Sequence, residues 1–345
     1  MTLSDSQNQV PPQMAMLEMV SSYWVTQCIY VAAKLGIADL LKDAPKHCDE
    51  LAAATNSHSD SLYRLLRALA SLDIFAETQP HYFQLTPLAD CLQSDVPHSI
   101  KDIALLMGEY HYQAWEHLLH SVKTGETAFE HFQGISVFEY NQQNPTARQV
   151  FDAAMTEYSA MEIEDILAVY DFSSINKLVD VGGGVGSLMA SILQKHSHMK
   201  GVLFDQPEVV GNAGNVFQAA GVGDRCEIVG GSFFEFVPEG GDTYLMKHII
   251  HDWDDERCVA ILKNCYRAMQ PESKLLILEY VIPPDNDYFM GKLLDINMLV
   301  MCPGGRERTE AEYRDLLKST GFELTNVVPS KLSGIAIIEA VPITN

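Results

Sequence analysis

Basic residues are scarce in this chain. Its 345 residues include 23 Lys plus Arg against 46 Asp plus Glu, which gives a formal net charge of −23. Proteins that follow a phosphate backbone use basic patches, so this balance argues against a nucleic-acid partner. It also disfavours an anionic membrane surface, but it leaves a small organic substrate open.

Three local patterns are absent as well. The seven cysteines form no C-x-x-C pair and are odd in number. This argues against a disulfide framework or a zinc ribbon, and it favours a reduced, cytoplasmic compartment. No run reaches about 18 apolar residues, the length typical of a membrane-spanning helix. Residues 2–9 are polar and lack the charged-then-apolar order of a secretion signal.

The first part of the chain is predicted to be mainly helical. Tyr23–Ala33 is apolar nearly all round and is expected to be buried from several sides. A helix over Ser59–Leu72 is followed by a hairpin of Phe75–Glu77 with Tyr82–Leu85, the outline of a winged helix. DNA binding is the plain interpretation of that outline, but the acidic charge disfavours it. We expect instead a layer that pairs two subunits, because so apolar a helix needs a partner surface.

From Lys177 onward, strands alternate with helices. This alternation predicts a parallel-type α/β sheet wrapped by helices on both faces. The chain is long enough for two domains. We divide it into a winged-helix-like dimerisation segment (1–100), a helical connector (101–170) and a sheet domain (171–345). The expected strands are Lys177–Val181, Gly201–Asp205, Glu227–Val229, Thr243–Lys247, Lys274–Val281, Glu323–Val328 and Ile335–Ala340, and the expected helices include Ser187–Lys195, Val209–Ala220, Asp255–Met269 and Glu310–Thr320.

A glycine turn follows the first of these strands. Gly182, Gly184 and Gly186 alternate after Asp180, and the sixth position is Ser187. This spacing is not the G-x-G-x-x-G of a dinucleotide site. Glycines let the backbone approach a ligand closely, and the following helix start favours a negative group. An acid-G-x-G-x-G turn resembles the first motif of S-adenosylmethionine (SAM)-dependent methyltransferases, where it wraps the amino-acid end of the cofactor.

Two later strand ends complete the expected cofactor site. Asp205 ends the second strand, where a carboxylate suits two ribose hydroxyls, although Asp205–Glu208 also resembles a helix start. Gly231 and Ser232 follow the third strand, and the serine hydroxyl suits the edge of an adenine ring. Phe233 suits the face of that ring, with a core aromatic as the alternative.

The segment Lys247–Asp255 carries His248 and His251 at the end of a strand, where open α/β sheets bind ligands. Two histidines three apart suit a metal if the segment is helical, but no third ligand stands at motif spacing and Lys247 would repel a cation. We expect no metal. A general base is the better use, because imidazole has an unperturbed pKa of about 6.5.

Two carboxylates are candidates to orient that base. Glu279 follows the apolar run 275–278, so we expect it to be half-buried and in need of a partner. Glu307 lies in a turn between Arg306 and Arg308, where a solvated charge is the alternative. Two carboxylates beside one imidazole would hold its tautomer and stabilise the imidazolium.

Together these segments resemble the small-molecule O-methyltransferases. The resemblance rests on Lys247…His251-Asp252-Trp253, on Glu279 before Pro283-Pro284, and on Pro303–Thr309, with Tyr63–Ala70 similar to the family's dimerisation domain. It implies a Rossmann-like class I methyltransferase, a homodimer, SAM as cofactor, and a small aromatic or polyketide-like natural product as acceptor. N-methylation, a SAM-binding hydroxylase or decarboxylase of the same fold, and a ligand-sensing winged-helix regulator are the alternatives.

The resemblance also implies residue roles. His251 matches the catalytic base, with Glu279 and Glu307 as the carboxylates that orient it. The implied cofactor contacts are Ser159, Gly182, Gly184, Asp205, Gly231, Ser232, Phe233 and Lys247. The implied acceptor contacts are Phe151, Met155, Tyr158, Asp252, Met298 and Cys302. Plant members usually carry Asp-Met in place of Ser232-Phe233, and phenylpropanoid enzymes often carry Asn and His at Cys302 and Tyr158. These departures predict an altered adenine contact and an acceptor other than a hydroxycinnamate.

Overall fold

The computed structural model describes residues 10–344, which form two compact units. The first unit comprises the chain up to Gln113 together with Thr146–Glu157, and the second comprises Ala114–Pro145 and everything from Tyr158 onward. The long helix α12, Pro145–Val169, therefore gives residues to both units. The predicted connector is shared between them, and the three-part division of the chain stays a prediction. Among residues 10–344, no helix is both long and apolar enough to cross a bilayer.

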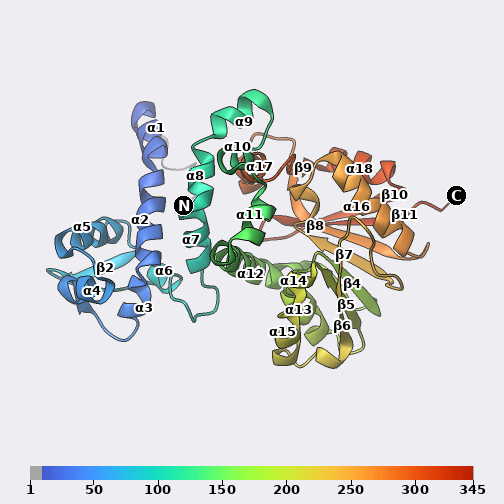
Figure 1. The fold of residues 1–345 in the computed structure, drawn as a ribbon, viewed down its shortest axis with the longest axis horizontal. Helices are drawn as coiled ribbons and strands as arrows, with labels where there is room; N and C mark the ends of the chain where they lie inside the picture. Colours follow the sequence, from blue (N-terminus) through green and yellow to red (C-terminus); the bar gives the residue numbers. More distant parts are fainter. Residues whose placement is uncertain (1–9, 345) are drawn as a thin grey trace. The chain divides into compact units, whose positions relative to one another are not determined.

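The first unit combines helices with a small sheet that contains β2 (Figure 1). The sheet is antiparallel, with the strand order β1-β3-β2. The predicted hairpin is β2 with β3, and Phe75 pairs with Leu85. Helix α7 packs against α2, where Gly108 leaves room for the ring of Tyr30. The elements are α1 Pro12–Ser21, α2 Tyr23–Lys34, α3 Ile37–Leu41, β1 Lys46–His47, α4 Cys48–Thr55, α5 Ser59–Ala70, β2 Phe75–Gln79, β3 Tyr82–Leu85, α6 Pro87–Asp90, α7 Lys101–Gly108 and the first four residues of α8 Tyr110–Trp115.

One prediction for this unit is wrong for the single chain. Helix α2 is not buried from several sides, because Tyr23 is 47% exposed and Trp24 is 61% exposed, and only Ala32 and Ala33 are fully buried. The preceding helix α1 continues this outward apolar face with Met16, Leu17 and Val20. One side of the helix meets its own unit, and the other side presents exposed apolar side chains, the kind of surface that a partner covers.

The second unit is built on an eight-stranded sheet of order β10-β11-β8-β7-β4-β5-β6, with β9 beside β8 (Figure 1). The strands from β4 to β8 run parallel, as predicted, but β11 and β10 are antiparallel, so the sheet is mixed. The strands are β4 Lys177–Val181, β5 Lys200–Asp205, β6 Cys226–Gly230, β7 Thr243–Lys247, β8 Lys274–Ile282, β9 Arg308–Thr309, β10 Phe322–Pro329 and β11 Ile335–Pro342.

Helices cover both faces of this sheet. Alternate strand residues enter two cores: Val179 and Tyr244 pack with α16 and α18, whereas Leu178 and Leu245 pack with α12 and α13. The predicted helix Val209–Ala220 is broken in two, because Gly211 and Asn212 are weak helix formers. The helices are α9 Leu118–Thr124, α10 Ala128–Gln133, α11 Val137–Gln143, α13 Ser187–Lys195, α14 Pro207–Val210, α15 Ala213–Ala219, η1 Gly223–Arg225, η2 Ile250–Asp252, α16 Asp255–Ala268, α17 Met290–Met301 and α18 Glu310–Ser319.

The parallel strands give the site its position. Since β4 to β8 point the same way, their carboxyl ends meet at one edge of the sheet. Gly182 follows β4, Asp205 ends β5, Gly231 follows β6 and Lys247 ends β7, so the structure gathers these predicted cofactor contacts along this edge.

Candidate active site

The glycine turn after β4 has the open backbone that the sequence predicts. Gly182, Gly184 and Gly186 have φ of +75°, +63° and +86°, values that L side chains rarely adopt. A Cβ on Gly184 would meet open space, whereas a Cβ on Gly182 would lie 2.3 Å from the side chain of Ile249. Gly184 is therefore the one glycine of this turn whose Cβ position borders open space.

Asp205 ties this turn to the next strand. Its carboxylate accepts the N–H of Gly184 at 2.9 Å and the N–H of Gln206 at 2.6 Å. It thus anchors the glycine turn to the end of β5. A helix does begin at Pro207, as the alternative for this segment has it, but no side chain caps it. A half-buried carboxylate that borders the open space at Gly184 fits the ribose end of a nucleoside.

Ser232 and Phe233 lie on the loop after β6. The Ser232 hydroxyl accepts the N–H of Phe234 at 3.3 Å, so it stabilises its own turn. The ring of Phe233 is half-buried: it packs on the sheet core and comes within 3.6 Å of the Cβ position of Gly182. Phe233 is therefore both a partly buried core aromatic and a ring that lies beside the glycine turn.

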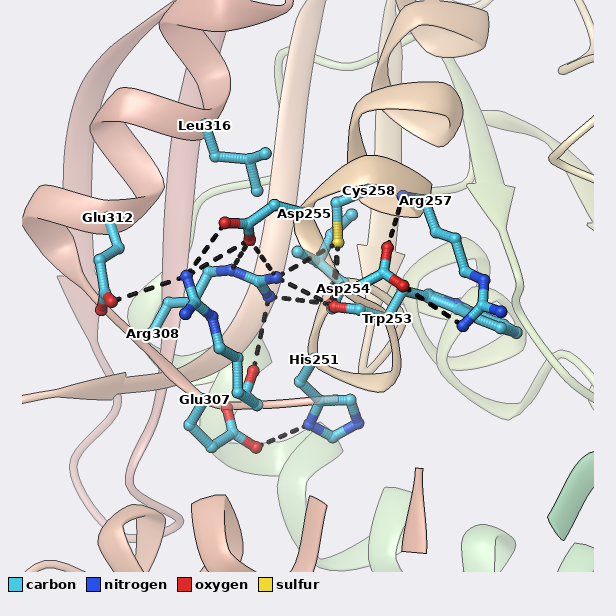
Figure 2. Close-up of polar contacts among 12 residues, drawn as sticks. His251, Trp253, Asp254, Asp255, Arg257, Cys258, Glu307, Arg308, Glu312 and Leu316 are labelled. Carbon is cyan, nitrogen blue, oxygen red and sulfur yellow. Dashed lines mark hydrogen bonds and ion pairs between the residues drawn. The ribbon is translucent and has the colours of Figure 1, made fainter. Parts of the chain in front are cut away.

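His251 lies on the short helix η2, which is held by side chains from two directions. Glu279 accepts the N–H groups of Ile249, Ile250 and His251 through Oε1, at 3.0, 2.9 and 3.3 Å. Arg308 donates to the carbonyl oxygens of the same segment (Figure 2). Each end of this loop is thus fixed by a buried charged group, which orders the backbone that carries the imidazole.

The two predicted carboxylates both face Nδ1 of His251. Glu307 Oε1 is 2.7 Å from Nδ1 and Glu279 Oε2 is 3.3 Å from it (Figure 2 shows the Glu307 contact). The expectation that Glu279 is half-buried is wrong, because it is completely buried among backbone N–H groups that replace water. The solvated alternative for Glu307 is also wrong, since its side chain is buried against the imidazole.

These contacts set the charge of the imidazole. Burial alone would lower the pKa of His251, but the carboxylates of Glu279, Glu307 and Asp252 outweigh it and raise the pKa to about 10. Burial would likewise raise the pKa of Glu279, but the neighbouring imidazoles and backbone N–H groups lower it. With Nδ1 taken by the carboxylates, Nε2 is the atom left to exchange a proton.

Glu162 of α12 is a site residue that sequence reasoning missed. Its carboxylate lies 2.9 Å from Nζ of Lys247 and 2.8 Å from Nε2 of His248. Lys247, the expected cofactor contact, therefore has a buried ion-pair partner within the protein. No spacing rule links residue 162 to residue 247, and Asp165 on the same helix is a second buried carboxylate, so the sequence held no signal that singled out Glu162.

The metal alternative gains a third candidate ligand in the structure. No such ligand is evident at motif spacing, but ligand atoms of His248, His251 and Glu279 lie within 4.8 Å of one another. Each imidazole of this group already has a carboxylate partner from outside the group: Glu307 for His251 and Glu162 for His248. The protein thus satisfies these imidazoles with carboxylates, an arrangement suited to acid–base chemistry.

The predicted acceptor contacts fall in both units. Met298 and Cys302, from α17 and its end, are buried in the second unit, where Cys302 Sγ donates to Oδ1 of Asp252 at 3.4 Å. Oδ1 of Asp252 lies 3.5 Å from Nε2 of His251, so Asp252 borders the free side of the imidazole. Tyr158 and Ser159 are half-buried in the same unit, whereas Phe151 and Met155 belong to the first unit.

The sheet order, the glycine turn and the imidazole at the strand ends define a class I methyltransferase. Comparison with known families agrees: an O-methyltransferase domain matches residues 115–323, and an O-methyltransferase dimerisation domain matches residues 17–95. The chain belongs to this O-methyltransferase family, its cofactor is SAM, and the second match supports the expected homodimer.

Similar proteins come from the bacterial natural-product branch. The phenazine O-methyltransferase PhzM of Lysobacter antibioticus is 46% identical over 343 residues, which are 99% of this chain and 100% of that protein. The crystal structure of LaPhzM has a TM-score of 0.94 at 47% identity and covers 97% of this chain and 100% of its own. CalO1, a methyltransferase in calicheamicin biosynthesis solved in its SAH-bound form, has a TM-score of 0.82 at 32% identity, over 96% and 98% of the two chains.

The names of the relatives differ in the atom that is methylated. The 8-amino-8-demethylriboflavin N,N-dimethyltransferase of Streptomyces davaonensis is 36% identical, over 88% of this chain and 88% of that protein. The comparisons thus establish a SAM-dependent methyltransferase of the natural-product branch, with both oxygen and nitrogen acceptors among its relatives.

Proposed function

We propose that the enzyme methylates a hydroxyl group of a small aromatic or polyketide-like natural product, with His251 as general base. The observation that carries this proposal is the contact of both Glu279 and Glu307 with Nδ1 of His251, at 3.3 and 2.7 Å. A hydroxyl group is a poor nucleophile until its proton is removed, and a positioned imidazole performs that step.

When bound, SAM supplies a methyl group on a positively charged sulfur that leaves as a neutral thioether. The residues of the chain must align the acceptor oxygen and take its proton. In the proposed step the new bond joins that oxygen to the methyl carbon, the carbon–sulfur bond breaks, and the proton passes to Nε2 of His251. Glu279 and Glu307 then stabilise the imidazolium, because both carboxylates already face its other nitrogen.

The glycine turn supports the assignment of the cofactor site. Open space at Gly184 beside the carboxylate of Asp205 fits an amino-acid and ribose moiety held against the backbone. Ser159, Gly182, Gly231, Ser232, Phe233 and Lys247 remain the further proposed contacts. We place the reaction in the cytoplasm, a proposal supported by seven cysteines that are all free of disulfides.

N-methylation is the second candidate, favoured by the relatives that carry that activity in their names. An amine attacks through a lone pair that is already available, so it depends less on a base. The buried carboxylate–imidazole cluster favours an oxygen acceptor, since a nitrogen acceptor has less need of a general base.

Methyl-labelled SAM with a panel of probes tests the proposal. A hydroxyphenazine and a naphthol are compared with the matching aromatic amines, and we expect label in the phenolic ethers. His251→Ala should lower kcat/KM for the phenol by about 10²–10⁴-fold, with SAH affinity unchanged in calorimetry.

Glu307→Gln serves as the graded comparison. It should lose less than His251→Ala, because Glu307 acts by orienting the ring. A loss of less than about tenfold in His251→Ala would contradict the base assignment, given that a positioned base typically contributes more. Transfer to the amines alone would favour the second candidate.

A further inference from the structure

The acid–base cluster extends beyond the three residues of the proposed mechanism. His248 lies between Glu162 and Glu279: its Nε2 is 2.8 Å from Glu162 Oε1, and its Nδ1 is 3.7 Å from Glu279 Oε2. Glu279 Oε2 is in turn 3.3 Å from Nδ1 of His251. Acidic and imidazole side chains therefore alternate along one line from α12 to the proposed base.

An uncommon backbone conformation, rather than a continuation of β7, places His248 in this line. Its N–H donates to the carbonyl oxygen of Leu278 on β8, and its φ is +54°, which is uncommon for a residue other than glycine. This conformation ends β7 and turns the ring toward both carboxylates. Its ring centroid lies 5.0 Å from that of His251, nearly parallel to it.

A protonated His248 reduces the excess of negative charge along this line, whatever the protonation state of His251. Three carboxylates, those of Glu162, Glu279 and Glu307, face Lys247 and the two imidazoles. Glu162 and Glu279 are almost completely buried, so an uncompensated charge there would be costly. Nδ1 of His248 and Oε2 of Glu279 have no hydrogen-bond partner and face each other, as an imidazolium and a carboxylate would.

We infer that Glu162 holds His248 as an imidazolium beside Glu279, and that this cation offsets part of the Glu279 charge acting on His251. Glu162 and His248 are thus positioning residues that tune the proton affinity of the base. The inference rests on the proposed role of His251. The charged and titratable groups that act on His248 are Glu162 from α12, Lys247 from β7, Glu279 and Tyr280 from β8, His251 and Asp252 from η2, and Glu307, which precedes β9.

The direction in which the pKa of His251 moves follows from the short distance between His248 and Glu279. Loss of the His248 cation removes a positive charge close to Glu279, so the carboxylate acts more strongly on His251 and its imidazolium becomes harder to deprotonate. The base form of His251 then appears at higher pH. A wild-type His248 cation is consistent with the raised pKa of this residue, where burial is outweighed by Glu162 and Glu279.

The first test measures the protonation state of His248 directly and needs no acceptor. In ¹⁵N-histidine-labelled enzyme with SAH at pH 7.5, the His248 ring nitrogens, assigned by their loss in His248→Asn, should show imidazolium shifts. Asparagine tolerates the positive φ, so the assignment variant keeps the turn. Glu162→Gln should give neutral His248 shifts, whereas Glu162→Asp and the exposed control Glu164→Gln on the same helix should keep the imidazolium. A neutral His248 in the wild type, or an imidazolium retained in Glu162→Gln, would overturn the inference.

The second test measures how His248 affects the pH at which His251 becomes an active base. With the hydroxyphenazine probe, the acidic limb of the kcat/KM–pH profile should move upward by about half to one unit in His248→Asn and Glu162→Gln. Glu162→Asp should return the limb toward its wild-type position, and only the exposed control Glu164→Gln should match the wild type throughout. A uniform fall in rate with no movement of the limb would show a merely structural role. If no phenol is methylated, the proposed function fails, while the first test still decides the state of His248.

Discussion

The guanidinium of Arg308 donates to the carbonyl oxygen of Ile250 at 3.0 Å. Ile250 directly precedes His251, and Arg308 directly follows Glu307, so two adjacent residues of one segment hold the backbone and the ring of the proposed base (Figure 2). Arg308 is completely buried and also bonds the carbonyl oxygen of Trp253 at 3.0 Å and Oδ1 of Asp255 at 2.8 Å. This clamp fixes His251 relative to Glu307.

Arg308→Lys should loosen the clamp. An ammonium group cannot reach two carbonyl oxygens and a carboxylate in the planar fork that a guanidinium provides. We expect kcat/KM to fall by about tenfold or more, and stability to fall by about 1–3 kcal/mol in urea unfolding, because buried backbone carbonyls lose a charged donor. The control is Arg306→Lys, whose half-exposed side chain bonds the same Asp255 at 3.1 Å and which should change stability by at most about 1 kcal/mol. Equal effects of the two variants would contradict the clamp.

Glu279→Gln should move the pH dependence of activity downward. Glu279 is among the carboxylates that raise the pKa of His251, and the base works only when the imidazole is neutral. Removal of this charge lowers the pKa, so activity rises at lower pH, with a shift of the acidic limb of about one unit or more. The kcat/KM–pH profile measures this. Movement of the limb to higher pH would show that Glu279 does not act on His251 by its charge.

Gly184→Ala and Gly186→Ala should separate cofactor binding from folding. Both glycines have positive φ, so each variant carries backbone strain of about 1–2 kcal/mol. A Cβ at position 184 meets only open space, where the cofactor is proposed to lie, but at position 186 it would lie 2.6 Å from the ring of Phe217. Calorimetry with SAH should show a loss of about tenfold or more in affinity for Gly184→Ala, as a steric clash at close backbone approach predicts.

Thermal unfolding completes this comparison. Gly186→Ala should lower the melting temperature more than Gly184→Ala, since it also strains the packing around Phe217. If the folded Gly184→Ala variant binds SAH as the wild type does, the cofactor does not lie against this residue.

Val20→Glu combined with Trp24→Glu should produce monomers. These side chains are 64% and 61% exposed in the single chain and lie within the matched dimerisation domain. A charge in a buried apolar interface is not compensated, so association weakens. Sedimentation velocity measures the mass. Leu332→Glu is the control, because Leu332 is 90% exposed but belongs to the second unit, and it should leave a dimer intact.

Most of the fold was predictable from local patterns in the sequence. The alternation of strands and helices after Lys177 predicts the parallel part of the sheet, because buried parallel strands are apolar runs with turn residues between them. The antiparallel direction of β10 and β11 was not predictable in this way, since their apolar patterns suit either direction. The burial of α2 within the single chain was overestimated for a related reason, although a partner surface was expected: composition alone does not distinguish the core of one chain from a surface shared by two.

The site was predictable where residues sit at strand ends and unpredictable where they meet across the fold. Glu279 follows an apolar strand, so its place beside the strand-end imidazole could be expected, although its complete burial could not. Glu162 and Arg308 act through bonds to residues far away in sequence, at Lys247, His248 and Ile250. Such pairings depend on the packing of α12 and β9 on the sheet, which no local spacing encodes.

The division of the chain into two compact units has an evolutionary consequence. His251, Glu279, Glu307, Arg308 and Glu162 all belong to the second unit, whereas Phe151 and Met155 belong to the first. The buried contacts that hold His251 come from Glu279, Glu307 and Arg308, all within the second unit. Substitutions at Phe151 or Met155 can therefore accumulate in the first unit without altering any of these contacts.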